Sequence, residues 1–71
     1  MNVEEFVSLN LSELAKQTGL NKSTWSRYIN EKRDPSVSTF ADIAFKLKMS
    51  DSELMEGLQR LRNIKHLKKH L

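Results

Sequence analysis

The chain has 71 residues, of which 38% are hydrophobic and none is cysteine; this length supports one domain with a small core and excludes a disulfide framework or a cysteine-based zinc site. Its net charge of +3 hides two basic regions, because residues 60–71 hold five basic residues and no acidic ones, and residues 16–33 hold five basic residues against one acidic. No signal-peptide pattern is present and no apolar run approaches the roughly 20 residues of a membrane helix, so we expect a soluble cytoplasmic protein without membrane contact.

Helix starts recur along the chain, whereas the alternation with a period of two that marks strands is absent. Each start carries a residue that caps helices well, and these residues are Asn10, Asn21, Ser36 and Ser50. At the first and the last of them, a glutamate three residues further on completes a capping box. The sequence therefore predicts an all-α fold with helices at about 2–8, 11–18, 22–30, 37–48 and from 51 onward.

The apolar residues of these helices are expected to pack into one shared core. They are Phe6, Leu14, Ala15, Leu20, Trp25, Tyr28, Ile29, Val37, Phe40, Ile43, Ala44, Leu47, Leu54 and Leu58. The whole chain, 1–71, is expected to be a single domain with its core over about 1–59. Residues 60–71 would then form a basic amphipathic helix or tail.

Residues 11–30 are predicted to form two short helices joined by a tight turn. Gly19 follows the first helix at a position that usually needs a positive φ, which glycine adopts without steric cost. Ala15 lies four residues earlier, where a larger side chain would push the two helices apart. A plain helical hairpin in a bundle would also use a glycine and an alanine. The outward face of the second helix favours a DNA-binding helix-turn-helix.

That outward face presents small polar and cationic side chains. We expect base contacts from Asn21, Lys22, Ser23, Thr24, Ser26, Arg27 and Asn30. Short side chains let a helix approach the base edges of the major groove, where arginine and lysine can donate to guanine and asparagine can pair with adenine. Residues near the start of such a helix reach the bases most deeply, which favours Lys22, Ser23 and Ser26. Arg27 suits either a base or a phosphate.

Phosphate contacts are expected around this helix. They are assigned to Ser12, Lys16, Lys32, Arg33 and Ser36. Lys32 and Arg33 lie in a loop that Pro35 stiffens, and Ser36 opens the next helix, whose free backbone amides can bind a phosphate. The alternative for the Lys-Arg pair is a solvated loop without a ligand.

Together these features resemble the lambda-repressor-like (Cro/CI-type) helix-turn-helix family of bacterial and phage regulators. The resemblance runs from Leu11 to Leu58. The matching residues are Glu13-Leu14-Ala15, Thr18-Gly19-Leu20, Ser23-Thr24, Ser26-Arg27-Tyr28, Asn30, Lys32-Arg33, Pro35-Ser36, Ile43-Ala44, Leu47, Met49-Ser50 and Glu53-Leu54. It implies a five-helix DNA-binding domain, here with an extended C-terminal helix, that binds operator DNA, usually as a dimer. The first helix departs from the family, because it is short and bears Glu4 and Glu5 in place of a basic residue. Leu11 also departs, since it stands where the family often has a glutamine.

The C-terminal helix carries an apolar stripe that continues past the expected core, with a spacing close to that of a coiled coil. The residues beyond the core are Leu61, Ile64, Leu67 and Leu71. Because they would be exposed in a monomer, we expect them to dimerise the protein and to set two recognition helices about 34 Å apart, one turn of DNA. A frayed basic tail and a phosphate-binding face are the alternatives. The basic residues concerned are Arg60, Arg62, Lys65, Lys68 and Lys69.

We therefore expect a regulator of transcription that binds specific double-stranded DNA sequences as a homodimer at the nucleoid. It would repress by occluding polymerase, since we expect no effector domain. The alternative is an antitoxin-like or other interaction module whose protein partner binds the C-terminal helix. Catalysis is not expected, because no paired carboxylates, nucleophile with its base or glycine-rich phosphate loop is present. His66 and His70 have a spacing used by zinc ligands, but no further ligand lies nearby, so neither a metal nor a cofactor is expected.

Overall fold

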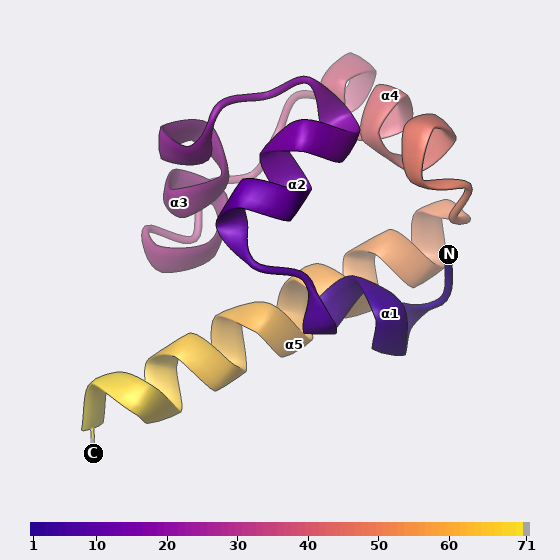
Figure 1. The fold of residues 1–71 in the computed structure, drawn as a ribbon. Coiled ribbons are helices and arrows are strands. Elements are labelled where there is room, and N and C mark those ends of the chain that lie inside the picture. Colours follow the sequence, from indigo (N-terminus) through magenta and orange to yellow (C-terminus); the bar gives the residue numbers. More distant parts are fainter. Residues whose placement is uncertain (71) are drawn as a thin grey trace.

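The computed structural model describes the backbone of residues 1–70 and the side chains of residues 1–64. This part of the chain is all-helical, which confirms the predicted fold class (Figure 1). The helices are α1 (Val3–Ser8), α2 (Leu11–Thr18), α3 (Lys22–Asn30), α4 (Val37–Leu47) and α5 (Asp51–His70). The described ends differ from the predicted ones by one residue at most.

The helix starts follow from the capping residues. Asn10 and Glu13 form the expected capping box of α2, in which the Asn10 side chain accepts the Glu13 amide at 2.8 Å and the Glu13 carboxylate accepts the Asn10 amide at 3.0 Å. Asn2 and Glu5 form a second box at α1 with the same two distances, which the sequence prediction did not identify. These bonds satisfy amides that a helix cannot pair internally, so the starts are determined locally.

α5 runs along the base of the molecule, and its C-terminal part extends past the other four helices (Figure 1). It packs against α1, α3 and α4, while α2 packs against α3 and α4. The buried core consists of Phe6, Leu14, Trp25, Ile29, Ile43, Ala44, Leu47, Met49, Leu54, Leu58 and Leu61. α5 is therefore the element against which α3 and the short α1 both pack, and α2 is held through α3 and α4.

The contact between α1 and α5 requires a residue without a side chain. Gly57 lies against the ring of Phe6, and a Cβ atom at this position would overlap that ring. A glycine inside a helix costs about 1 kcal/mol relative to alanine. Here that cost is offset by the burial of Phe6, which is fully enclosed. Gly57 is thus a packing position and does not end α5.

The prediction that Val37 belongs to the core is wrong. Its side chain is 89% exposed, because it shares the outward face of α4 with Ala41 and Phe45, at spacings of four residues. The inward face of α4 is formed by Ile43, Ala44 and Leu47, with Phe40 half-buried beside them. Met49, which follows α4, is buried in the core and was not predicted there.

The expectation that Leu61 is exposed in a single chain is also wrong. Leu61 is only 6% exposed and belongs to the core, since α5 is still packed against α3 at this point. Arg62 is buried beside it. The packed body therefore continues to Arg62, past the boundary expected near residue 59. No helix within the described residues has the length and apolar character needed to cross a membrane.

Candidate nucleic-acid interface

α2 and α3 are joined by a turn that depends on one glycine. Gly19 has φ 75° and ψ 3°, in the left-handed region, and its amide donates to the carbonyl of Ala15 at 2.9 Å. Asn21 then begins α3 in extended backbone. The predicted need for a positive φ at Gly19 is confirmed, and it explains how two helices can be connected by so few residues.

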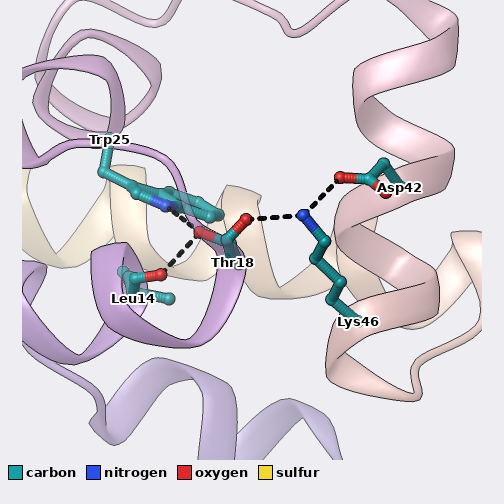
Figure 2. A network of polar contacts seen from close by, with 5 residues as sticks. All are labelled: Leu14, Thr18, Trp25, Asp42 and Lys46. Atoms are coloured by element: carbon teal, nitrogen blue, oxygen red, sulfur yellow. Dashed lines mark hydrogen bonds and ion pairs between the residues drawn. The ribbon is translucent and has the colours of Figure 1, made fainter.

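A buried polar chain fixes the two helices to each other (Figure 2). The indole Nε1 of Trp25 donates to Oγ1 of Thr18 at 2.9 Å, and this hydroxyl donates to the carbonyl of Leu14 at 2.6 Å. Thr18 and Trp25 are both almost completely buried. The hydroxyl of Thr18 therefore satisfies the one polar group of the tryptophan, and the ring can act as the main apolar contact of α3 without an unpaired donor.

α4 holds the same turn from outside. Nζ of Lys46 donates to the carbonyl of Thr18 at 3.0 Å and lies 3.0 Å from the carboxylate of Asp42, one helical turn earlier (Figure 2). A cation at the last carbonyls of a helix is favourable because those carbonyls carry the negative end of the helix dipole. No local pattern in the sequence predicts this role of Lys46, because its partner Thr18 is 28 residues away.

α3 buries one face and presents the other. Trp25 and Ile29 are buried, and Tyr28 meets the Trp25 ring edge-on, with ring centres 5.6 Å apart. Most of the residues predicted to contact bases lie away from this buried face, but Lys22 lies one turn before Trp25 and lines a groove with Ile29. Exposed among them are Asn21, Lys22, Ser23 and Arg27, and half-buried are Thr24, Ser26 and Asn30. All of them belong to α3 or, for Asn21, to its N-cap.

Several polar groups of this face already bond to one another. Oδ1 of Asn21 accepts the Thr24 amide at 2.9 Å and the hydroxyls of Ser23 and Thr24 at 2.8 Å each. Nδ2 of Asn30 donates to Oγ of Ser26 at 3.0 Å. Asn21 therefore serves first as the cap of α3, and the Ser26–Asn30 pair forms a fixed polar unit. The side chains of Lys22 and Arg27 take no part in these hydrogen bonds.

The loop after α3 places the Lys-Arg pair at the surface. Lys32 has φ 55°, a left-handed conformation that is uncommon for a residue with a side chain, and both Lys32 and Arg33 are exposed. The Arg33 amide returns to the carbonyl of Arg27 at 3.2 Å, and its side chain lies 3.6 Å from the carboxylate of Glu31. The loop therefore folds back against the end of α3.

Arg62 of α5 reaches this loop, which corrects its assignment to an outward basic face. Its side chain is only 8% exposed. Nε donates to the carbonyl of Tyr28 at 2.8 Å, and Nη2 donates to the carbonyl of Arg33 at 2.8 Å and to the carboxylate of Asp34 at 3.0 Å. A guanidinium that is buried and bonded in this way is turned away from solvent and from any phosphate.

The remaining predicted phosphate contacts occupy two places. Ser12 and Lys16 are exposed on α2, and a groove of about 440 Å³ joins Ser12 to Lys22 at the starts of α2 and α3. Ser36 caps α4, because its Oγ accepts the Thr39 amide at 3.3 Å and donates to the Thr39 hydroxyl at 2.9 Å. The amide-rich start of α4 is thus adjacent to the Lys32–Arg33 loop.

Of the four residues predicted to dimerise the protein, two can be placed by their side chains. Leu61 is used in the core of its own chain, and Ile64 is 39% exposed. The side chains of Leu67 and Leu71 lie outside the described residues.

A family model described as a Cro/C1-type HTH DNA-binding domain matches residues 7–57. This range contains α2, α3 and α4 in full, together with the turn and loop that flank α3. No curated protein and no solved structure matches the chain.

Proposed function

The chain belongs to the Cro/C1-type family of helix-turn-helix DNA-binding domains, and we propose that it is a transcriptional repressor of the small phage or bacterial type. In this proposal α3 lies in the major groove of an operator and reads its sequence. The observation that carries the proposal is the division of α3 into a buried apolar face and an outward face of short polar and cationic side chains. Residues of this kind permit close approach to base edges.

Base readout is assigned first to the two cations of α3. Lys22 and Arg27 are exposed at the start and in the last turn of the helix, and both can donate to O6 and N7 of guanine. Ser23, Ser26 and Asn30 lie beside them and can add shorter contacts. Because Asn21 and Thr24 bond to each other at the cap, their contribution to readout is expected to be smaller.

Phosphate contacts on both sides of α3 would fix its orientation in the groove. On one side stand Ser12 and Lys16 of α2, and on the other stand Lys32, Arg33 and the start of α4 at Ser36. Helix starts and cations are the groups that bind phosphate oxygens most readily. Two such groups flanking a recognition helix would clamp it across the groove.

A homodimer is part of the proposal, with the C-terminal end of α5 as its interface. Ile64 together with Leu67 and Leu71 would supply the apolar contact, and Leu61 is excluded because it lies in the core of its own chain. Two copies would place their α3 helices about 34 Å apart, matching one turn of DNA. Such a complex would act at the nucleoid by covering a promoter.

Selection of binding sites from a pool of random duplex DNA, using the purified protein, tests this function. A two-fold symmetric consensus is the expected result, with half-sites one helical turn apart. A single short site would keep the sequence reader and overturn the dimer. Failure to enrich any sequence would overturn sequence-specific DNA recognition and favour a protein partner for α5, as in an antitoxin.

Arg27→Ala tests the assignment of readout to α3. Its affinity for the selected site should fall by about 1–3 kcal/mol, and the preference at one base position should relax. The matched control is Arg60→Ala, which removes an exposed arginine of α5 that is paired with Glu56. An unchanged consensus in the Arg27 variant would remove Arg27 from base readout.

A further inference from the structure

We propose that Arg62 is a positioning residue for DNA binding: from inside α5 it holds the loop 31–35 in the shape that presents Lys32 and Arg33 to phosphate. The effect on DNA binding rests on the proposed function. The hold of Arg62 on the loop rests on contacts within the protein itself. The proposal assigns a role in DNA binding to a side chain that itself stays away from the DNA.

The contacts of Arg62 span the junction between α3 and the loop. One guanidinium binds the carbonyl of Tyr28, in the last turn of α3, and the carbonyl of Arg33, in the loop, each at 2.8 Å. It also binds the carboxylate of Asp34 at 3.0 Å. Because the guanidinium is planar and rigid, these bonds set the position of the loop backbone relative to the end of α3.

The other bonds of the loop are local, since the amides of Glu31 and Arg33 both donate to the carbonyl of Arg27, at 3.1 and 3.2 Å. Lys32 adopts a left-handed φ of 55°, which is unfavourable for a residue with a Cβ atom, and Asp34 has a side chain that is 79% exposed. Such a conformation persists only where the surrounding structure determines it. Arg62 is the buried group that binds this segment from another helix, so we assign the conformation of Lys32 and Arg33 to it.

This geometry requires an arginine, and a lysine cannot replace it. The Nε and Nη2 donors point in fixed directions along one edge of the guanidinium and reach two carbonyls at once. The ammonium of lysine is a single point with three donors on a flexible chain. Arg62→Lys therefore keeps the positive charge of α5 and removes the two-point attachment.

The first test measures the loop in the protein without DNA. Backbone ¹⁵N relaxation and amide hydrogen exchange are compared for the wild type, Arg62→Lys and the matched control Arg60→Lys, which makes the same change at an exposed position of α5. Arg62→Lys should increase motion and exchange at residues 31–35, and the amides of α2 should be unaffected. A loop that is equally ordered in all three proteins would overturn the proposal.

The second test measures the salt dependence of binding to the duplex obtained by selection, at a temperature where each variant is folded. Arg62→Lys should lower the slope of log K against log salt by about one or two, as expected for the loss of one or two phosphate contacts. In a double-mutant cycle, Arg62→Lys should cost less affinity when Arg33→Ala is already present. An unchanged slope with additive costs would mean that Arg62 serves stability alone.

One further variant keeps the outcomes separate. Asp34→Ala removes one exposed partner of Arg62 and should mobilise the loop in the same direction by a smaller amount, even if Arg62→Lys does not fold. If the wild type binds no duplex, the proposed function fails. In that case the relaxation and hydrogen-exchange measurements on the protein without DNA still show whether Arg62 positions the loop.

Discussion

The turn before α3 and the loop after it are both held by a cation from a helix farther along the chain. Lys46 of α4 binds the carbonyl of Thr18 at the end of α2, and Arg62 of α5 binds the carbonyls of Tyr28 and Arg33 at the end of α3. The two cations nevertheless differ in surroundings. Lys46 has a half-exposed side chain with Asp42 beside it, whereas Arg62 is buried.

The local sequences of the two connections explain this difference. The turn has its own conformational signal in Gly19, and its hydroxyl–indole bond between Thr18 and Trp25 lies inside the helix pair. The loop has a lysine, Lys32, where its backbone enters the left-handed region. A connection with strong local signals needs little help from elsewhere in the fold. One without them depends on a distant side chain.

Removing each of the two cations should show the largest difference in stability between the turn and the loop. Arg62→Met should lower the free energy of unfolding by about 3 kcal/mol, because it leaves two carbonyls in a partly buried site without their charged donor. Lys46→Met should cost less than about 1 kcal/mol, since its ion pair is exposed. Urea unfolding followed by circular dichroism measures both. Equal losses would contradict the comparison.

Gly19→Ala tests the local signal of the turn. A Cβ atom there would meet only Nζ of Lys46 at 3.6 Å, so the expected loss of about 1–2 kcal/mol comes from the left-handed backbone. Gly19→Asn should lose less, because asparagine tolerates this conformation better. Thermal unfolding of the two variants checks the order. An alanine variant as stable as the wild type would mean that the turn can relax out of its positive φ.

Lys32→Gly tests the loop by the opposite change. Glycine relieves the left-handed strain at Lys32, so the free energy of unfolding should rise by about 0.5 kcal/mol. Lys32→Ala, its control, should give no such gain. Both variants should lower the salt slope of DNA binding by about one, because both lose the cation. If glycine raised stability and left the slope unchanged, Lys32 would not contact a phosphate.

The smallest expected effect concerns the capping box at the start of α5. Hydrogen bonds from the backbone and side chain of Ser50 hold the pKa of Glu53 below its usual value of 4.5. Because the pKa of Glu53 is lower in the folded state than in the unfolded state, the ionised carboxylate stabilises the fold. This stabilisation is fully present above pH 4.5 and is lost as the pH falls through the lower folded pKa. Glu53→Gln should therefore destabilise slightly at pH 7 and converge with the wild type in acid. A difference that stays constant with pH would contradict this assignment.

Much of the fold and the composition of the recognition face could be predicted because the signals are local. Asn10 and Gly19 determine a helix start and a turn through bonds and backbone angles within a few residues of themselves. The spacing of Trp25 and Ile29 along α3 identifies its buried face and leaves polar residues such as Ser23 and Arg27 exposed. The predicted DNA contacts themselves stay predictions, although the fold gathers those residues around α3.

Apart from the local capping box of Asn2 and Glu5, the failures concern residues whose burial depends on how the helices pack. Val37 was placed in the core because it is apolar, but its position on α4 turns it outward. Leu61 is apolar and late in the chain, beyond the expected core, yet α5 carries it into that core along α3. Apolar character and spacing predict that a helix has a buried face, and they do not state how far along the helix that burial continues.

The sequence by itself determined the number and starts of the helices, the glycine turn and the membership of α3 in a helix-turn-helix pair, because capping and backbone conformation act over three or four residues. Only the tertiary structure decided which cations are free to meet DNA. Arg62 and Tyr28 are 34 residues apart and Lys46 and Thr18 are 28 apart, so their bonds exist only when α4 and α5 are packed against the pair. A charge in the sequence becomes a surface contact or an internal support according to that packing.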